Sequence, residues 1–138
     1  MTSIMGAGND TISGWGGADF IAGGAGTDLL RGGPGDNAAD TFLFNALTDS
    51  AVGTARDIIE DFVSGIDNLD LAAIDANAAV AGDQSFLFGG TTAKANAIWY
   101  AATADGILVR ADVNGNTGAD FEVLLRGVTS VTGNDFVL

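Results

Sequence analysis

The chain has 138 residues, enough for one domain with a modest core, and it is 47% hydrophobic, which argues against disorder despite 21 glycines. It contains no cysteine and no histidine, so disulfides, thiolate chemistry, histidine-ligated zinc and serine–histidine catalysis are excluded within it. The net charge of −13 repels nucleic acids and anionic membranes, and no apolar run is long enough to span a membrane.

A nine-residue repeat occupies the N-terminal part of the chain, in units at 5–13, 14–22 and 23–31. Every unit has an aspartate at its sixth place and an aliphatic residue two places later. The aspartates are Asp10, Asp19 and Asp28, and the aliphatic residues are Ile12, Ile21 and Leu30. A fourth unit begins at Gly32 and loses the spacing, because Asn37 stands where aspartate is expected and Asp40 follows three residues later.

The unit predicts a parallel β-roll. Its glycine-rich first six residues favour a turn, and its last three favour an extended strand with one inward side chain. Two units make one coil, so Asp10 is expected beside Asp28, and Asp19 beside the region of Asn37 and Asp40. Stacked carboxylates repel each other, and a hard cation with six or more oxygen ligands, such as Ca²⁺, removes that repulsion. A flexible glycine-rich linker is the alternative, but it has no reason to keep this register.

The rest of the chain reads as a cap on this roll. Residues 5–44 are expected to form the roll, with Phe42 continuing its inner row, and 45–55 a loop with one helical turn. A short helix is expected within 74–80. Strands are expected at 57–62, 68–71, 86–88, 97–102, 107–113, 121–125 and 136–138. The sequence therefore predicts one all-β domain, 1–138, with 45–138 as an antiparallel β cap containing short helical turns.

The repeat matches G-G-x-G-x-D-x-U-x, the calcium-binding repeat of RTX (hemolysin-type) proteins. The segments that follow it, at 40–44, 57–62, 65–71 and 135–138, resemble the C-terminal domain of serralysin-type metalloproteases. The resemblance implies a secreted, extracellular bacterial module that binds several Ca²⁺ and ends in a type I secretion signal. The expected partners are an upstream catalytic or passenger domain and the secretion machinery. Protease activity is not implied, because the catalytic zinc motif needs histidines, so the activity of the parent protein stays open.

The resemblance also implies the calcium ligands. The first site would join the carbonyls of Gly6 and Gly8 and the side chain of Asp10 to the carbonyls of Gly23 and Ala25 and the side chain of Asp28. The second would join Trp15, Gly17 and Asp19 to Gly32 and Pro34, closed by Asn37 or Asp40. Asp49 and Asp57 could close a further half-site, or serve only in turns and caps.

A second candidate metal loop lies at 112–120. Its oxygen-bearing side chains stand at places 1, 3, 5 and 9, as in the first part of an EF-hand loop; they are Asp112, Asn114, Asn116 and Asp120. The usual glycine at place 6 and glutamate at place 12 are missing. An Asn-Gly hairpin turn is the alternative interpretation.

Apolar residues at outward places indicate a covered surface. Trp15, Phe20 and Leu29 would pack against an upstream domain or a second copy of the chain, unless they are scattered exposed residues. The function predicted from these features is a calcium-binding module for secretion and folding, without catalytic activity. The alternative is a calcium-dependent carbohydrate-binding or adhesive module, with Trp99 and Tyr100 as its aromatic platform.

Overall fold

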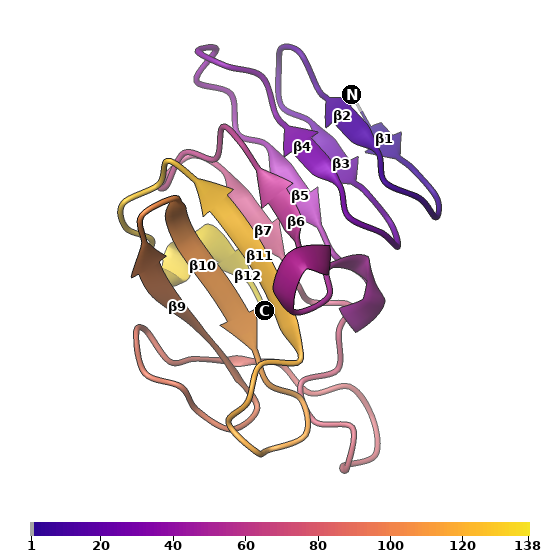
Figure 1. Ribbon diagram of the computed structural model, residues 1–138, viewed down its shortest axis with the longest axis vertical. Helices are drawn as coiled ribbons and strands as arrows, with labels where there is room; N and C mark the ends of the chain where they lie inside the picture. The colour runs from indigo at the N-terminus through magenta and orange to yellow at the C-terminus, as the bar shows by residue number, and fades with distance from the viewer. Residues whose placement is uncertain (1) are drawn as a thin grey trace.

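The computed structural model describes residues 2–138 as two facing β-sheets joined by turns (Figure 1). In the first sheet every neighbouring pair of strands is parallel. Its strands, in spatial order, are β1 (Thr2–Ile4), β3 (Phe20–Ala22), β5 (Thr41–Leu43), β7 (Asn68–Asp70) and β12 (Phe136–Val137).

The second sheet changes from parallel to antiparallel along its width. In spatial order its strands are β2 (Thr11–Ser13), β4 (Leu29–Arg31), β6 (Asp57–Ile59), β11 (Phe121–Arg126), β10 (Gly106–Ala111), β9 (Ala97–Thr103) and β8 (Leu87–Phe88). The first four strands are parallel, the pairs β11–β10 and β10–β9 are antiparallel, and the edge strand β8 is parallel to β9. Three 3₁₀ turns complete the fold: η1 (Leu47–Asp49), η2 (Gly53–Ala55) and η3 (Gly133–Asp135).

In β2, β3, β4, β5 and β7 the middle side chain lies between the sheets, and in β6 the last one, that of Ile59, does so. The register places Ile12 beside Leu30 and Leu30 beside Ile59 in one sheet. The other sheet places Ile21 beside Phe42 and Phe42 beside Leu69. All six side chains are buried in one continuous core, which extends into the antiparallel strands. A single coil buries little apolar surface alone, so the stacking supplies the stability. The predicted all-β parallel roll is confirmed.

Parallel stacking continues beyond residue 44, where the sequence predicted an antiparallel cap. β6 and β7 form another coil of the roll, and β11 and β12 pair in parallel with them. In the part of the chain that the structure describes, antiparallel pairing is limited to β9, β10 and β11 of the second sheet. The reason is that insertions at 44–56 and 60–67 lengthen the turns and hide the nine-residue spacing without ending the stack.

The helix predicted within 74–80 is wrong, because this segment forms turns. The carboxylate of Asp75 accepts hydrogen bonds from the backbone N–H groups of Asn77 and Gln84, and the Asn77 side chain accepts one from Ala79. Such local bonds offer the backbone an alternative to a helix, and they outweigh the alanine content here. No helix of residues 2–138 has the length and apolar character needed to cross a membrane.

Candidate calcium-binding turns

The turns that join the two sheets lie in two columns. The first turn column contains the turns 5–10 and 23–28 and the loop 44–56. The second turn column contains the turns 14–19, 32–40 and 60–67. Each column stacks turns that belong to successive coils, so residues at the same place of a unit lie one above another.

An aspartate ladder runs along the first turn column. The backbone N–H of Asp10 donates to Oδ1 of Asp28 over 2.8 Å, as the predicted 18-residue stacking requires. The N–H of Asp28 donates in turn to Oδ1 of Asp57, also over 2.8 Å. Asp28 and Asp57 are 2% and 0% exposed, and the second carboxylate oxygen of each has no hydrogen-bond partner among residues 2–138. Two buried, unpartnered carboxylate oxygens therefore lie in neighbouring coils.

A matching ladder runs along the second turn column. The N–H of Asp19 donates to Oδ1 of Asp40 over 2.9 Å, and the N–H of Asp40 donates to Oδ1 of Asp67 over 3.0 Å. Of the two residues that the sequence left open as the partner of Asp19, the structure aligns Asp40. Asn37 is exposed in a left-handed turn conformation, with φ of 56°, outside the ladder.

The backbone of each turn packs closely on the next. A Cβ atom at Gly24 would collide with the carbonyl oxygen of Gly6, and one at Gly26 would collide with that of Gly8. In the second turn column, a Cβ atom at Gly33 would collide with the carbonyl oxygen of Trp15. Glycine is therefore required at these places of the repeat. The packing brings three of the predicted carbonyl ligands, those of Gly6, Gly8 and Trp15, against the following coil.

The other predicted ligands are distributed unevenly. Gly23 lies against the carboxylate of Asp28, and Gly32 lies against that of Asp40. The Ala25 carbonyl accepts a hydrogen bond from the N–H of Gly8 over 2.8 Å, so it already has a partner in the neighbouring turn. Gly17 and Pro34 are exposed at the outer edge of the second turn column.

The ionised form of the ladder carboxylates is unfavourable, because they are buried and lie close to one another. Burial, together with the charges of Asp28 and Asp49, raises the pKa of Asp57 from 3.8 to about 8. Burial, together with the charges of Asp67 and Asp19, raises the pKa of Asp40 to about 6. Burial likewise raises the pKa of Asp28. Bringing a cation between the coils would remove this electrostatic penalty.

Arginine does not neutralise the ladders. The four arginine ion pairs all go to the two glutamates: Arg31 and Arg126 to Glu60, and Arg56 and Arg110 to Glu122. Within residues 2–138 no group of three or more acidic side chains could hold a metal ion through carboxylates alone. A cation would therefore need backbone carbonyls as well, and a mixed set of carbonyl and carboxylate oxygens suits Ca²⁺.

Asp57 was predicted only as one of two residues, with Asp49, that could close a further half-site, and Asp67 was missed, although the sequence contains a signal for both. Asp57 stands two places before the buried Ile59, and Asp67 two places before the buried Leu69. An aspartate followed at two places by an inward aliphatic side chain is the strand signal of the repeat itself. Searching for this signal without the nine-residue spacing would have found both.

The loop at 112–120 has a different geometry. The buried carboxylate of Asp112 accepts hydrogen bonds from four backbone N–H groups, those of Asn96, Asn114, Gly115 and Thr117. Burial raises the pKa of Asp112, but these bonds outweigh it and hold the pKa below its usual value.

The remaining side chains of this loop are engaged within it too. Asp120 accepts from the N–H of Val113 and from the Asn114 amide, and Asn116 accepts from the N–H of Gly118. This is the arrangement expected of the hairpin-turn alternative, and it offers no unpartnered buried oxygen comparable to those of the ladders. Metal binding here stays a prediction.

The three outward apolar residues do not form one surface. Phe20 points outward from β3 in the first sheet, whereas Leu29 points outward from β4 in the other, facing sheet. Trp15 is 78% exposed in the second turn column, and Leu29 is half-buried. A shared interface built by all three residues is therefore not supported.

Stacked glycine–aspartate turns on a parallel β-roll define a calcium-binding repeat module of the RTX type. The family model described as Peptidase M10 serralysin C terminal matches residues 2–138, and the chain belongs to this family. The C-terminal repeat domain of serralysin is non-catalytic, and the family is one of secreted, extracellular proteins.

Two solved structures are similar over the whole chain. The AlgE6R3 subunit of the Azotobacter vinelandii mannuronan C5-epimerase is 28% identical with a TM-score of 0.63, over 99% of this chain and 76% of that one. The AlgE6R2 subunit of the same epimerase is 26% identical with a TM-score of 0.57, over 100% of this chain and 92% of that one. No curated protein sequence matches this chain.

Proposed function

We propose that this chain is the calcium-binding C-terminal module of a type I-secreted bacterial protein, which folds on Ca²⁺ outside the cell and carries the secretion signal. The observation that carries the proposal is the pair of buried, unpartnered carboxylate oxygens of Asp28 and Asp57. Membership of the serralysin C-terminal family supports it. The upstream passenger domain and the secretion machinery are the proposed partners.

The first turn column would bind Ca²⁺ through Asp10, Asp28 and Asp57, together with backbone carbonyls of the turns 5–10 and 23–28. The second would use Asp19 and Asp40 with carbonyls of the turns 14–19 and 32–40. When bound, Ca²⁺ supplies positive charge that the ladders lack and cross-links successive coils. Because the core runs without interruption from the roll into the antiparallel strands, we propose that residues 1–138 respond as one domain.

Calcium concentration would then decide whether the chain is folded. Extracellular calcium modules have dissociation constants of roughly 10⁻⁴–10⁻³ M. At ten times that constant each site adds about 1.4 kcal/mol to the folded state, whereas sub-micromolar cytosolic calcium adds almost nothing. Several sites acting together would change a marginally stable chain from unfolded to folded.

The pairing of β12 with β7 agrees with such a switch. β12 is paired with β7, and Phe136 is 8% exposed, so the last residues belong to the folded roll. Val137, next to Phe136, stays 43% exposed. A secretion signal in this segment would be a free, extended peptide only while the chain is unfolded, and folding outside the cell would then fix it in the sheet.

Far-UV circular dichroism in EDTA, followed by addition of 5 mM CaCl₂, tests the folding step. We expect a large gain of β-signal on adding calcium, a reduced response in Asp28→Asn, and an unchanged one in Asp105→Asn. Asp105 is a suitable control because it lies exposed in the β9–β10 turn, and its substitution removes the same charge. A fully folded roll in EDTA would exclude the proposal.

The secretion role needs its own experiment. The segment 89–138, fused to a reporter protein and expressed with a type I exporter, is expected to direct the reporter into the medium. The same fusion without residues 136–138 should stay inside the cell. Export of both fusions to equal extents would rule out a signal at the C-terminus.

The alternative of carbohydrate binding loses its main support. Trp99 is 6% exposed, and the ring of Tyr100 stacks on Phe88 with the ring centroids 6.3 Å apart. These two residues therefore do not form the open aromatic platform that the sequence suggested.

A further inference from the structure

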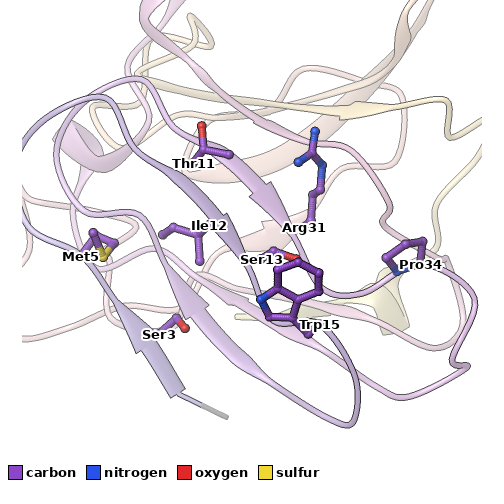
Figure 2. Close-up of a pocket in the computed structure, with 8 residues that line it drawn as sticks. All are labelled: Ser3, Met5, Thr11, Ile12, Ser13, Trp15, Arg31 and Pro34. Atoms are coloured by element: carbon purple, nitrogen blue, oxygen red, sulfur yellow. The ribbon is translucent and has the colours of Figure 1, made fainter.

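The roll has an open end at its N-terminal side. Within residues 2–138, β1 pairs only with β3, and β2 pairs only with β4, so both sheets finish in a free edge at the same end (Figure 1). A groove of about 900 Å³ lies at this end, with Met5, Ile12 and Trp15 among the residues that line it (Figure 2). Free parallel edges beside exposed apolar side chains would normally favour the stacking of another coil.

The covered coils show what such stacking demands of the second place in each unit. That place is Gly24 in the first turn column and Gly33 in the second, with φ of 86° and 154°. A Cβ atom at either position would collide with the backbone carbonyl of the preceding coil, that of Gly6 or Trp15. Both collisions are with backbone, which cannot move aside as a flexible side chain could. A residue at the second place must therefore be glycine if another coil covers it.

Trp15 occupies the second place of its own unit. Its φ of 76° is close to the 86° of Gly24, where a Cβ would collide with the preceding coil, whereas Gly33 of its own turn column has φ of 154°. Among residues 2–138 nothing lies on the turn around it, since a Cβ at Gly17 would meet nothing within 4 Å, whereas one at the equivalent Gly26 would meet the Gly8 carbonyl. The indole thus stands, 78% exposed, where the turn of a preceding coil would lie.

We propose that Trp15 terminates the roll, by preventing any coil of the same repeat from stacking on the turn 14–19. The block is steric and begins at Cβ, so it acts on a repeat from this polypeptide and on one from another molecule alike. The backbone groups at the edges of β1 and β2 stay available for hydrogen bonds, but a further coil cannot pair with these edges in the parallel register. The inference rests on the backbone packing and does not depend on calcium.

The test lengthens the roll by one coil. A second copy of residues 5–22 is inserted between Ile4 and Met5, so that the inner copy of Trp15 is covered by the turn of the outer copy. Three versions carry tryptophan, alanine or glycine at this inner position, and all three keep tryptophan in the outer copy. Thermal unfolding followed by circular dichroism in CaCl₂, the condition in which the chain is expected to be folded, compares them.

We expect the version with glycine to unfold at a higher temperature than the unextended chain, and the versions with tryptophan and alanine to unfold at a lower one. Limited proteolysis gives a second readout, since the added coil should be protected only in the glycine version. Equal stability and protection of the tryptophan and glycine versions would overturn the proposal. An alanine version that behaves like the glycine version would overturn the assignment of the block to Cβ. Unextended Trp15→Gly, which should fold, is the control for the substitution itself.

Discussion

Replacing Asp57 by asparagine gives the sharpest test of the aspartate ladder. The folded chain raises the pKa of Asp57 from 3.8 to about 8, because the side chain is fully buried and lies near the charges of Asp28 and Asp49. An acid with a higher pKa in the folded state binds more protons when folded. Its contribution to calcium-free stability is therefore complete below about pH 4 and is lost as the pH rises toward about 8.

The size of the effect follows from the proton difference. One proton bound by the folded chain and not by the unfolded chain changes the free energy of unfolding by about 1.4 kcal/mol per pH unit. Between about pH 5 and pH 7, Asp57 alone should therefore remove about 2–3 kcal/mol of calcium-free stability. Asparagine resembles the protonated acid in shape, and its Oδ1 can still accept the N–H of Asp28. In EDTA near pH 8 the variant should thus be more stable than the wild type by more than this, because the loss accumulates over the whole interval from about pH 4 to about pH 8.

The calcium-free chain is first folded in EDTA with the osmolyte trimethylamine N-oxide, and the folded fraction is followed by circular dichroism at several pH values. Urea unfolding in CaCl₂ then gives the calcium response. Calcium should stabilise Asp57→Asn less than the wild type, because the variant lacks a carboxylate ligand. Asp105→Asn is the matched control and should change neither the pH dependence nor the calcium response. The reasoning is refuted if Asp57→Asn in EDTA is no more stable than the wild type near pH 8.

Three further predictions concern strain, packing and the 112–120 loop. Trp15→Gly should raise the free energy of unfolding in urea by about 1 kcal/mol, because φ of 76° strains a residue with a side chain. Trp15→Ala should give no such gain, and equal gains would show that strain is not the cause. Gly24→Ala should lower the free energy of unfolding by more than about 2 kcal/mol, and Gly35→Ala should lower it clearly less. Both glycines have positive φ, but only Gly24 faces a backbone carbonyl, so equal losses would contradict the packing argument. Asp112→Ala should lower the free energy of unfolding by about 2–3 kcal/mol, because it removes the acceptor of four backbone N–H groups. Titration calorimetry should show an unchanged calcium stoichiometry if the loop is only a hairpin turn, and the loss of one calcium ion would support the metal-loop prediction.

The regular part of the roll could be predicted because the nine-residue spacing of the repeat fixes the number of residues in each coil. Two units make one coil, so Asp10 had to lie beside Asp28 and Ile12 beside Leu30, and the structure contains both pairings. The antiparallel hairpin β9–β10 was equally accessible, because a turn signal at 105–106 separates two apolar runs.

The later coils could not be predicted from spacing. The insertion before β6 shifts Asp57 out of the nine-residue register, although its carboxylate stacks on Asp28 as Asp28 stacks on Asp10. The pairing of β6 with β11 joins segments far apart in the sequence, and no local period encodes it. The pattern of the repeat shows that Trp15 stands where the repeat has glycine. It does not show that this departure obstructs another coil, since the conflict arises only when the coils are stacked.

The ion pairs have a consequence for how the two parts of the molecule hold together. Glu60 binds Arg31 of β4 and Arg126 of β11, and Glu122 binds Arg56 and Arg110, so both glutamates bridge the junction where β6 meets β11. The Glu60 pairs are partly exposed and weaken as sodium chloride screens them, whereas Glu122 is largely shielded from solvent. High ionic strength should therefore weaken the Glu60 side of this junction first. The antiparallel strands β9, β10 and β11 should then separate from the roll before the coils of the roll unfold.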